Sequence, residues 1–217
     1  MRRITKLTPN KEISDYVEES INLAQPYLDR GEEIPSSVLS RYNYGPLKDI
    51  IVRETSGKCV YCESKILMNQ PGELDHMVPK SKFISDKDAN GIYNYSNLTL
   101  SCNICNNTKK SLGTNYPLLS PYTNKPERHI YFVGPMIFHH TPEGRKLILS
   151  LNLDQRDDLV TNLRRRLREI DILIKDLERE RDEEIKTIIR RRLKRESLKD
   201  KEYSLAVFNF LRYHKII

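Results

Sequence analysis

CVYC, residues 59–62, is matched by CNIC, residues 102–105, and these two pairs hold all four cysteines of the 217-residue chain. Each CxxC turn presents two thiolates, so two turns can complete a tetrahedral shell of four sulfurs around a zinc ion. Such a shell leaves no open position, which makes the ion structural. Two disulfides or four unrelated buried thiols are the alternatives. The N-terminus, MRRITKLTPN, has no apolar run typical of a secretory leader, so we expect a cytoplasmic protein with reduced thiols.

The 39 residues between the cysteine pairs contain GELDHMVPKS, residues 72–81, in which Asp75 directly precedes His76. Neighbouring side chains of a strand point to opposite faces, so Asp75 and His76 would face away from each other. A shared function of the two residues has to be compatible with these opposite directions. The segment reads in order as the β-like ELDHMV, a polar loop, the alternating LTLSC and the short helix candidate NNTKKSLG. We therefore expect two short strands and a helix within residues 58–113.

Taken together, CVYC, ELDHMVPKS, NYSNLTLSCNIC and NNTKK resemble a zinc-stapled HNH endonuclease of the ββα-metal class, over residues 58–111. The resemblance implies that the Asp faces a catalytic metal ion while the His faces the substrate phosphate, so that the scissile group lies between them. It assigns roles to eight side chains: Cys59, Cys62, Cys102 and Cys105 to a structural zinc, Asp75 and Asn106 to a catalytic divalent ion, His76 to the general base and Asn97 to bracing the loop. The family often has His where this chain has Asn106.

Phosphodiester hydrolysis suits these residue types. A neutral imidazole, with an ordinary pKa near 6.5, accepts a proton from water at neutral pH. Oxygen ligands favour Mg²⁺ or Mn²⁺, which relieves charge at the leaving oxygen. Lys109 and Lys110 are expected to contact the phosphate electrostatically. Each residue also has a plainer interpretation as a turn, cap or surface residue, and Glu73 either supports the site or faces solvent.

The flanking segments read as mainly helical. Residues 11–25 carry apolar residues at helical spacing and are expected to end at Pro26, Pro35 suits a first helical turn, and residues 47–57 form a second amphipathic run that stops at Gly57. Residues 116–153 mix prolines with aromatics and predict loops and short elements. We expect an α+β protein with N-terminal helices at 1–57, the HNH core at 58–115, a loop-rich extension at 116–153 and a charged helical region at 154–217.

The C-terminal region has one apolar seam, formed by Leu163, Leu167, Ile170, Ile174 and Leu177. The seam breaks and restarts in a shifted register at Ile185 and Ile189, which favours a helical hairpin or docking helix over a long coiled coil. Two basic clusters, at 164–168 and 190–195, suggest either a solvated surface, a partner-docking surface or phosphate contacts. The final segment, YSLAVFNFLRYHKII, is apolar enough to pack on the core or on another chain.

A net charge of +7 is compatible with an anionic partner, and no apolar stretch is long enough to cross a bilayer. Two further segments are YPLLSPYTNKPERHIYF, residues 116–132, and TPEGRKLILSLNLDQRDDLV, residues 141–160. With the CVYCE start, they resemble, over residues 45–170, the HNH proteins of retron and Septu-type antiphage systems, which implies an ATPase partner bound through the C-terminal helices. We therefore expect a metal-dependent endonuclease acting on nucleic acid, on DNA rather than RNA. The alternatives are a noncatalytic zinc-dependent nucleic-acid-binding adaptor and a subunit of a larger assembly.

Overall fold

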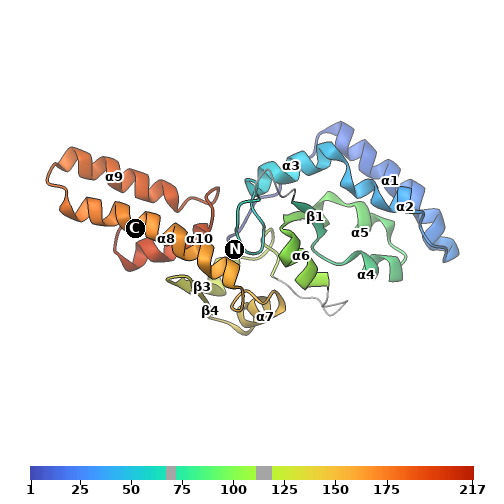
Figure 1. Cartoon of the computed structure of the whole chain (residues 1–217). Helices are drawn as coiled ribbons and strands as arrows, with labels where there is room; N and C mark the ends of the chain where they lie inside the picture. Colours follow the sequence, from blue (N-terminus) through green and yellow to red (C-terminus); the bar gives the residue numbers. More distant parts are fainter. Residues whose placement is uncertain (67–71, 111–118) are drawn as a thin grey trace. The chain divides into compact units, whose positions relative to one another are not determined.

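The computed structural model describes residues 1–66, 72–110 and 119–217 (Figure 1). The chain forms two compact units, one made of Thr5–Val60 and Lys65–Pro117 and the other of Met1–Ile4, Tyr61–Ser64 and Leu118–Ile217. Within the described ranges, no helix combines the length and the apolar character needed to cross a membrane.

The unit that contains the Asp75-His76 pair is built from short helices around a two-stranded sheet. Its elements are α1 (Lys11–Arg30), α2 (Ser36–Leu39), η1 (Ser40–Asn43), α3 (Gly45–Thr55), β1 (Glu73–His76), α4 (Lys80–Ser85), α5 (Ala89–Tyr93), η2 (Tyr95–Asn97), β2 (Leu98–Ser101) and α6 (Asn103–Lys110).

Helix α1 continues past the proline at which the sequence pattern predicts its end. The side chain of Asn10 caps its first turn, and the helix stops only at Gly31, whose φ of 70° suits a left-handed C-cap. The predicted stop at Pro26 is wrong. Burial explains the difference, because Ala24 and Leu28, on either side of the proline, both pack into an apolar cluster with α5. This packing stabilises the last turn and offsets the hydrogen bond that proline cannot donate.

Helix α3 buries the apolar face that its sequence pattern predicts. Leu47, Ile50 and Ile51 are at most 4% exposed and pack against Leu74 of β1 and Leu98 of β2. The chain leaves the helix through Ser56, which has a positive φ of 56°, and Gly57 follows with a φ of 65°. The helix thus ends at Thr55, two residues before the predicted glycine, and covers one face of the small sheet.

Strands β1 and β2 pair in antiparallel fashion, with Asp75 opposite Thr99 and His76 opposite Leu98. The backbone N–H of Val60 donates to the carbonyl of Leu100 at 3.0 Å, which attaches the first cysteine turn to β2. Helix α6 follows β2 directly after Cys102, so the strand–strand–helix order expected from the sequence is confirmed.

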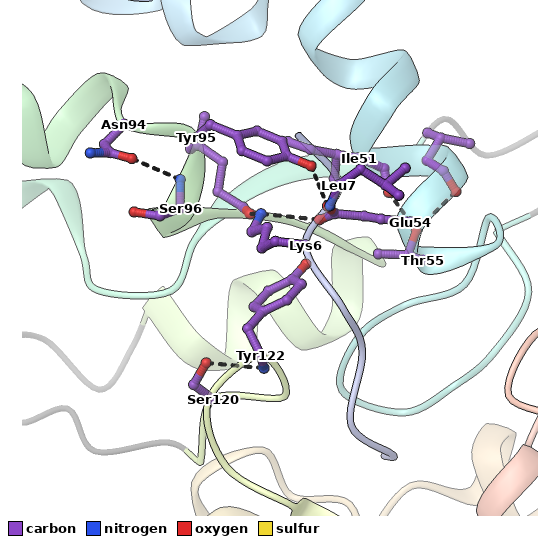
Figure 2. Close-up of polar contacts among 12 residues, drawn as sticks. Lys6, Leu7, Ile51, Glu54, Thr55, Asn94, Tyr95, Ser96, Ser120 and Tyr122 are labelled. Atoms are coloured by element: carbon purple, nitrogen blue, oxygen red, sulfur yellow. Dashed lines mark hydrogen bonds and ion pairs between the residues drawn. The ribbon is translucent and has the colours of Figure 1, made fainter. Parts of the chain in front are cut away.

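Figure 2 shows a polar cluster around Glu54 of α3, which includes Lys6, Leu7 and Tyr95. The buried carboxylate of Glu54 accepts hydrogen bonds from the hydroxyl of Tyr95, from Lys6 Nζ at 3.0 Å and from the backbone N–H of Leu7 at 3.2 Å. Lys6 also donates to the carbonyl of Leu98. Burial lowers the pKa of Lys6 to about 8, although Glu54 acts in the opposite direction.

The described part of the second unit contains a β-hairpin and the helices α7 to α10. Its elements are η3 (Pro126–Arg128), β3 (Ile130–Val133), β4 (Met136–His139), α7 (Pro142–Ser150), α8 (Asp157–Arg179), α9 (Glu183–Glu196) and α10 (Ser204–Tyr213). Strands β3 and β4 are antiparallel, with Tyr131 opposite Phe138.

Helices α8 and α9 form the expected helical hairpin, and all five residues of the predicted seam are buried in α8. The predicted restart of the seam is wrong at Ile185, which is 43% exposed; Leu193, at 0%, is the residue of α9 that fills the core. Helix α10 adds Val207 and Leu211 to the same cluster. The shifted heptad register did not predict the buried residues of α9, because α9 runs back along α8 after a turn. The turn sets which residues of α9 contact α8, and a continued heptad does not.

Candidate active site

The strand β1 borders a cleft of about 660 Å³ within the first unit. Its walls come from η1, α3, β1, the following loop, α4 and α6. The lining residues are Tyr42, Asn43, Lys48, Gly72, Glu73, Leu74, Asp75, His76, Pro79, Lys80, Ser81, Asn106 and Lys109. Asp75 and His76 therefore line one cleft although they are neighbours in a strand.

Asp75 points toward α6. Its carboxylate forms a buried ion pair with Lys109, whose ammonium also donates to the backbone carbonyl of His76. The side chains of Asp75 and Lys109 are 6% and 4% exposed. The Asp75 carboxylate, which pairs with the Lys109 ammonium in the structure, is also a suitable ligand for a metal ion, because the same negative charge attracts either cation.

Glu73, two residues before Asp75 on the same face of β1, reaches the same helix. Its carboxylate accepts a hydrogen bond from the side-chain amide of Asn106. Asn106 is only 4% exposed, and both residues line the cleft. The carbonyl oxygen of Asn106 is the other atom of this amide, and it is a ligand type that hard divalent ions accept.

His76 points away from α6, toward η1 and α5. Its Nε2 lies 2.8 Å from the carbonyl oxygen of Ile92, and because a carbonyl only accepts, Nε2 carries the proton and Nδ1 is the basic nitrogen. The ring of Tyr42 packs edge-on against it, with centroids 4.7 Å apart. Burial lowers the pKa of His76 to about 3, and the charges of Lys80 and Lys109 act in the same direction. The imidazole is therefore neutral at neutral pH.

Asn97 holds the loop that follows His76. Its side-chain oxygen accepts from the backbone N–H of Val78 at 2.8 Å, and its amide donates to the carbonyls of Val78 and Gly91 at 3.1 and 3.0 Å. The backbone carbonyl of Asn97 also accepts from Met77 at 2.7 Å. This one residue thus links the loop after β1 to α5 and to the start of β2.

The four cysteines form a cluster. The sulfurs of Cys59, Cys62, Cys102 and Cys105 all lie within 4.8 Å of one another. A tetrahedral zinc site with Zn–S bonds of 2.3 Å has sulfurs about 3.8 Å apart, so the arrangement is consistent with a structural zinc. Three of the cysteines are buried, which suits the closed shell of a structural zinc.

Comparison with protein-family models matches residues 59–112 to the model described as HNH, HNH endonuclease. This segment is an HNH endonuclease domain. The match covers the two cysteine turns with β1, β2 and α6, and so includes the sulfur cluster and part of the cleft wall. An HNH domain implies an enzyme that hydrolyses phosphodiester bonds in nucleic acid. A search of curated proteins finds no match to the chain.

The expected fold class is confirmed, because the HNH domain is a small α+β unit with a four-cysteine cluster and helices on both sides in the sequence. The structure also brings residues to the cleft that the motif did not indicate. Tyr42 and Lys48 come from η1 and α3, outside the residues 59–112 that match the family model. Their sequence context, an ordinary amphipathic helical region, carries no signal for this placement.

Two lysines were expected to contact substrate. Lys109 instead pairs with Asp75 in the described structure, while Lys80, which was not singled out, lines the cleft and lies 3.3 Å from the hydroxyl of Tyr42. Lys110 is the last residue of α6, and its side chain lies outside the described part of the chain.

Proposed function

We propose that the cleft beside β1 is the catalytic centre of a Mg²⁺- or Mn²⁺-dependent endonuclease that cuts DNA. The observation that carries this proposal is the convergence of Asp75, His76 and Asn106 on one cleft of about 660 Å³ inside the HNH domain.

Asp75 and Asn106 are the proposed ligands of the catalytic ion. The donor set fits Mg²⁺ or Mn²⁺, because one carboxylate and one amide carbonyl leave further positions for water and phosphate oxygens. The ammonium of Lys109 on Asp75 supports this choice, since it is a cation held by the same carboxylate. When bound, the ion would supply charge relief at the leaving oxygen.

His76 is the proposed general base. Its Nε2–H is held by the carbonyl of Ile92, which fixes the ring and leaves the lone pair of Nδ1 to take a proton from water. The ring of Tyr42 limits its rotation. Asn97 is proposed to act through position alone, by holding the loop that begins directly after the base.

Phosphate contacts are proposed for Lys80 and Lys48, whose side chains line the cleft. The expected phosphate contacts of Lys109 and Lys110 remain part of the proposal. For Lys109 such a contact requires the ammonium to leave Asp75, which a divalent ion on that carboxylate would favour by charge repulsion.

Supercoiled plasmid incubated with the zinc-loaded protein tests this proposal. We expect nicking with Mg²⁺ or Mn²⁺ and none when EDTA is added. His76→Ala should reduce the rate by about 10²- to 10⁴-fold while zinc content and DNA binding remain. His139→Ala, at an exposed position of β4, is the matched control and should cut at the wild-type rate. DNA binding without cleavage by the wild-type protein, alone and with its partner, would favour the noncatalytic adaptor.

We further propose that the protein serves an antiphage complex and binds an ATPase through its C-terminal helices. Exposed apolar residues on these helices support a docking role: Ile172 of α8 and Ile188 of α9 are 53% and 57% exposed. The adjoining surface is charged, and the pair Arg166–Glu196 joins the two helices beside both basic clusters. These clusters are also suited to phosphate contacts.

Co-purification with the ATPase tests the docking surface. Deletion of residues 155–217 should abolish it, and Ile188→Asp should do so while leaving the folded protein intact. Val133→Asp, at an exposed position of the β3–β4 hairpin, is the control and should leave co-purification unchanged. Retention of the partner by the deletion variant would exclude the C-terminal helices as its binding site.

A further inference from the structure

Strand β1 and helix α6 face one another through two side-chain pairs. Glu73 and Asp75 are two residues apart in a strand and share a face, and Asn106 and Lys109 are three apart in a helix and share a face. Glu73 pairs with Asn106, and Asp75 pairs with Lys109. Each pair therefore contains one proposed metal ligand and one residue that has no assigned role as a ligand.

The structure assigns Glu73 a positioning role: it selects the orientation of the Asn106 amide that offers oxygen to the catalytic ion. This inference rests on the proposed function, in which Asn106 is a ligand. A carboxylate accepts hydrogen bonds, so the Asn106 group that contacts it is the NH₂, and the carbonyl oxygen is turned away from Glu73.

The orientation matters because the carbonyl and NH₂ groups of the Asn106 side chain are similar in size, while the first accepts hydrogen bonds and the second donates them. A divalent ion binds the carbonyl oxygen and is not bound by the NH₂ group. Without Glu73, the buried Asn106 side chain loses the acceptor that distinguishes these two orientations. Residues that orient metal ligands in this way affect metal affinity by about 10- to 100-fold.

A different role for Glu73 would be direct coordination of the ion. Its carboxylate lines the same cleft, so the two roles need to be separated by experiment. They make different predictions when Asn106 is absent. A positioning residue loses its effect with its ligand, whereas a direct ligand or a nearby negative charge keeps its effect.

The test is Mn²⁺ binding, measured by calorimetry and by electron paramagnetic resonance, to the full-length zinc-loaded protein. We expect Glu73→Ala to weaken Mn²⁺ binding by about 10- to 100-fold. Glu73→Gln should lose less, because its carbonyl still accepts from the Asn106 amide through a weaker neutral bond. In the Asn106→Ala background, Glu73→Ala should cause no further loss.

An equal loss from Glu73→Ala in both backgrounds would overturn the positioning role, as would a Glu73→Gln variant as weak as Glu73→Ala. Zinc content and cooperative unfolding verify that each variant is folded; if Glu73→Ala fails this check, Glu73→Gln with and without Asn106→Ala carries the comparison. Asp75→Asn distinguishes a failure of the proposed metal site from a failure of the positioning role of Glu73. If the wild-type protein binds no Mn²⁺, or if Asp75→Asn binds Mn²⁺ as tightly as the wild type, the metal assignment is overturned and the role of Glu73 with it.

Discussion

The buried ammonium of Lys109 lies against the carboxylate of Asp75 and the backbone carbonyl of His76, beside the cleft that all three residues line. Lys109 lies three positions after Asn106 on α6, so the helix delivers both a cation and an amide to β1. The pair neutralises a carboxylate that would otherwise be buried as a single charge, which is costly in a water-poor environment. The HNH domain therefore balances the charge of its proposed metal ligand with its own side chain.

Removal of this cation should make the stability of the HNH domain depend on a divalent ion. Lys109→Met leaves Asp75 buried without the pair, and losing one partner of a buried pair costs about 3 to 5 kcal/mol. We expect the free energy of unfolding of the zinc-loaded variant to fall accordingly, and added Mn²⁺ to recover more stability in the variant than in the wild type. Denaturant unfolding with and without Mn²⁺ measures both effects.

Lys82→Met is the matched control, because Lys82 pairs with Asp86 on the surface with both side chains about half exposed. It should change the free energy of unfolding by no more than about 0.5 kcal/mol, with no dependence on Mn²⁺. A Lys109→Met protein as stable as the wild type without Mn²⁺ would contradict the importance of the buried pair.

Loss of the Asn97 side chain should loosen the loop that begins after His76. Asn97→Ala removes three hydrogen bonds to partly buried backbone groups of Val78 and Gly91, which lowers the free energy of unfolding by about 2 to 3 kcal/mol. The Val78 amide should also exchange faster with solvent, as measured by hydrogen exchange. Asn94→Ala removes two exposed hydrogen bonds, the cap to the Ser96 N–H and the bond to the Asn90 side chain, and should cost about 1 kcal/mol without affecting the Val78 amide. Unchanged exchange in Asn97→Ala would show that the loop is held by other contacts.

Substitution of one cysteine should release the zinc and unfold the HNH domain. Cys102→Ser leaves three thiolates, and a structural zinc supplies folding free energy on the order of 10 kcal/mol. Zinc content and circular dichroism measure the outcome. Ser101→Ala is the neighbouring control, since its buried hydroxyl has no hydrogen-bond partner in the described structure, and it should keep both zinc and fold. A folded, zinc-free Cys102→Ser protein would rule out a structural metal.

The buried lysine beside Glu54 should make stability rise with pH on the alkaline side. The pKa of Lys6 is about 8 in the folded protein and 10.5 ordinarily, so between these values the unfolded chain binds more protons than the folded protein. The free energy of unfolding therefore increases as pH rises from about 8 to about 10, by at most about 1.4 kcal/mol per pH unit. The measurement is limited to pH 10 and below because burial raises the pKa of Tyr93 to about 12. Above pH 10 this tyrosine ionises more readily in the unfolded chain, which lowers the free energy of unfolding.

Denaturant unfolding at several pH values checks this slope. Lys6→Met should remove the increase, because the group that titrates is gone, whereas Lys11→Met, at an exposed position of α1, should keep it. A wild-type free energy of unfolding that stays flat or falls between pH 8 and pH 10 would show that Lys6 is not held at a lowered pKa.

Local patterns were sufficient to predict the elements of the HNH domain and the helical hairpin. The two CxxC turns, the alternation of LTLSC and the apolar seam of α8 each involve residues whose spacing is set by one strand or one helix. The clustering of the four sulfurs was also predictable, because a tetrahedral ion requires it. Local patterns were insufficient at Pro26 and Ile185, where packing against α5 and the reversal of α9 decide the outcome.

The sequence by itself determined which chemical groups this protein has and in what order: four thiolates, the Asp75-His76 pair and an asparagine on either side of the second strand. Only the tertiary structure decided their partners, Lys109 for Asp75, Glu73 for Asn106, and the Ile92 carbonyl with Tyr42 for His76. The physical reason is that backbone geometry sets the directions of neighbouring side chains, whereas contacts across 16 to 34 residues depend on how a strand, a helix and a loop pack together.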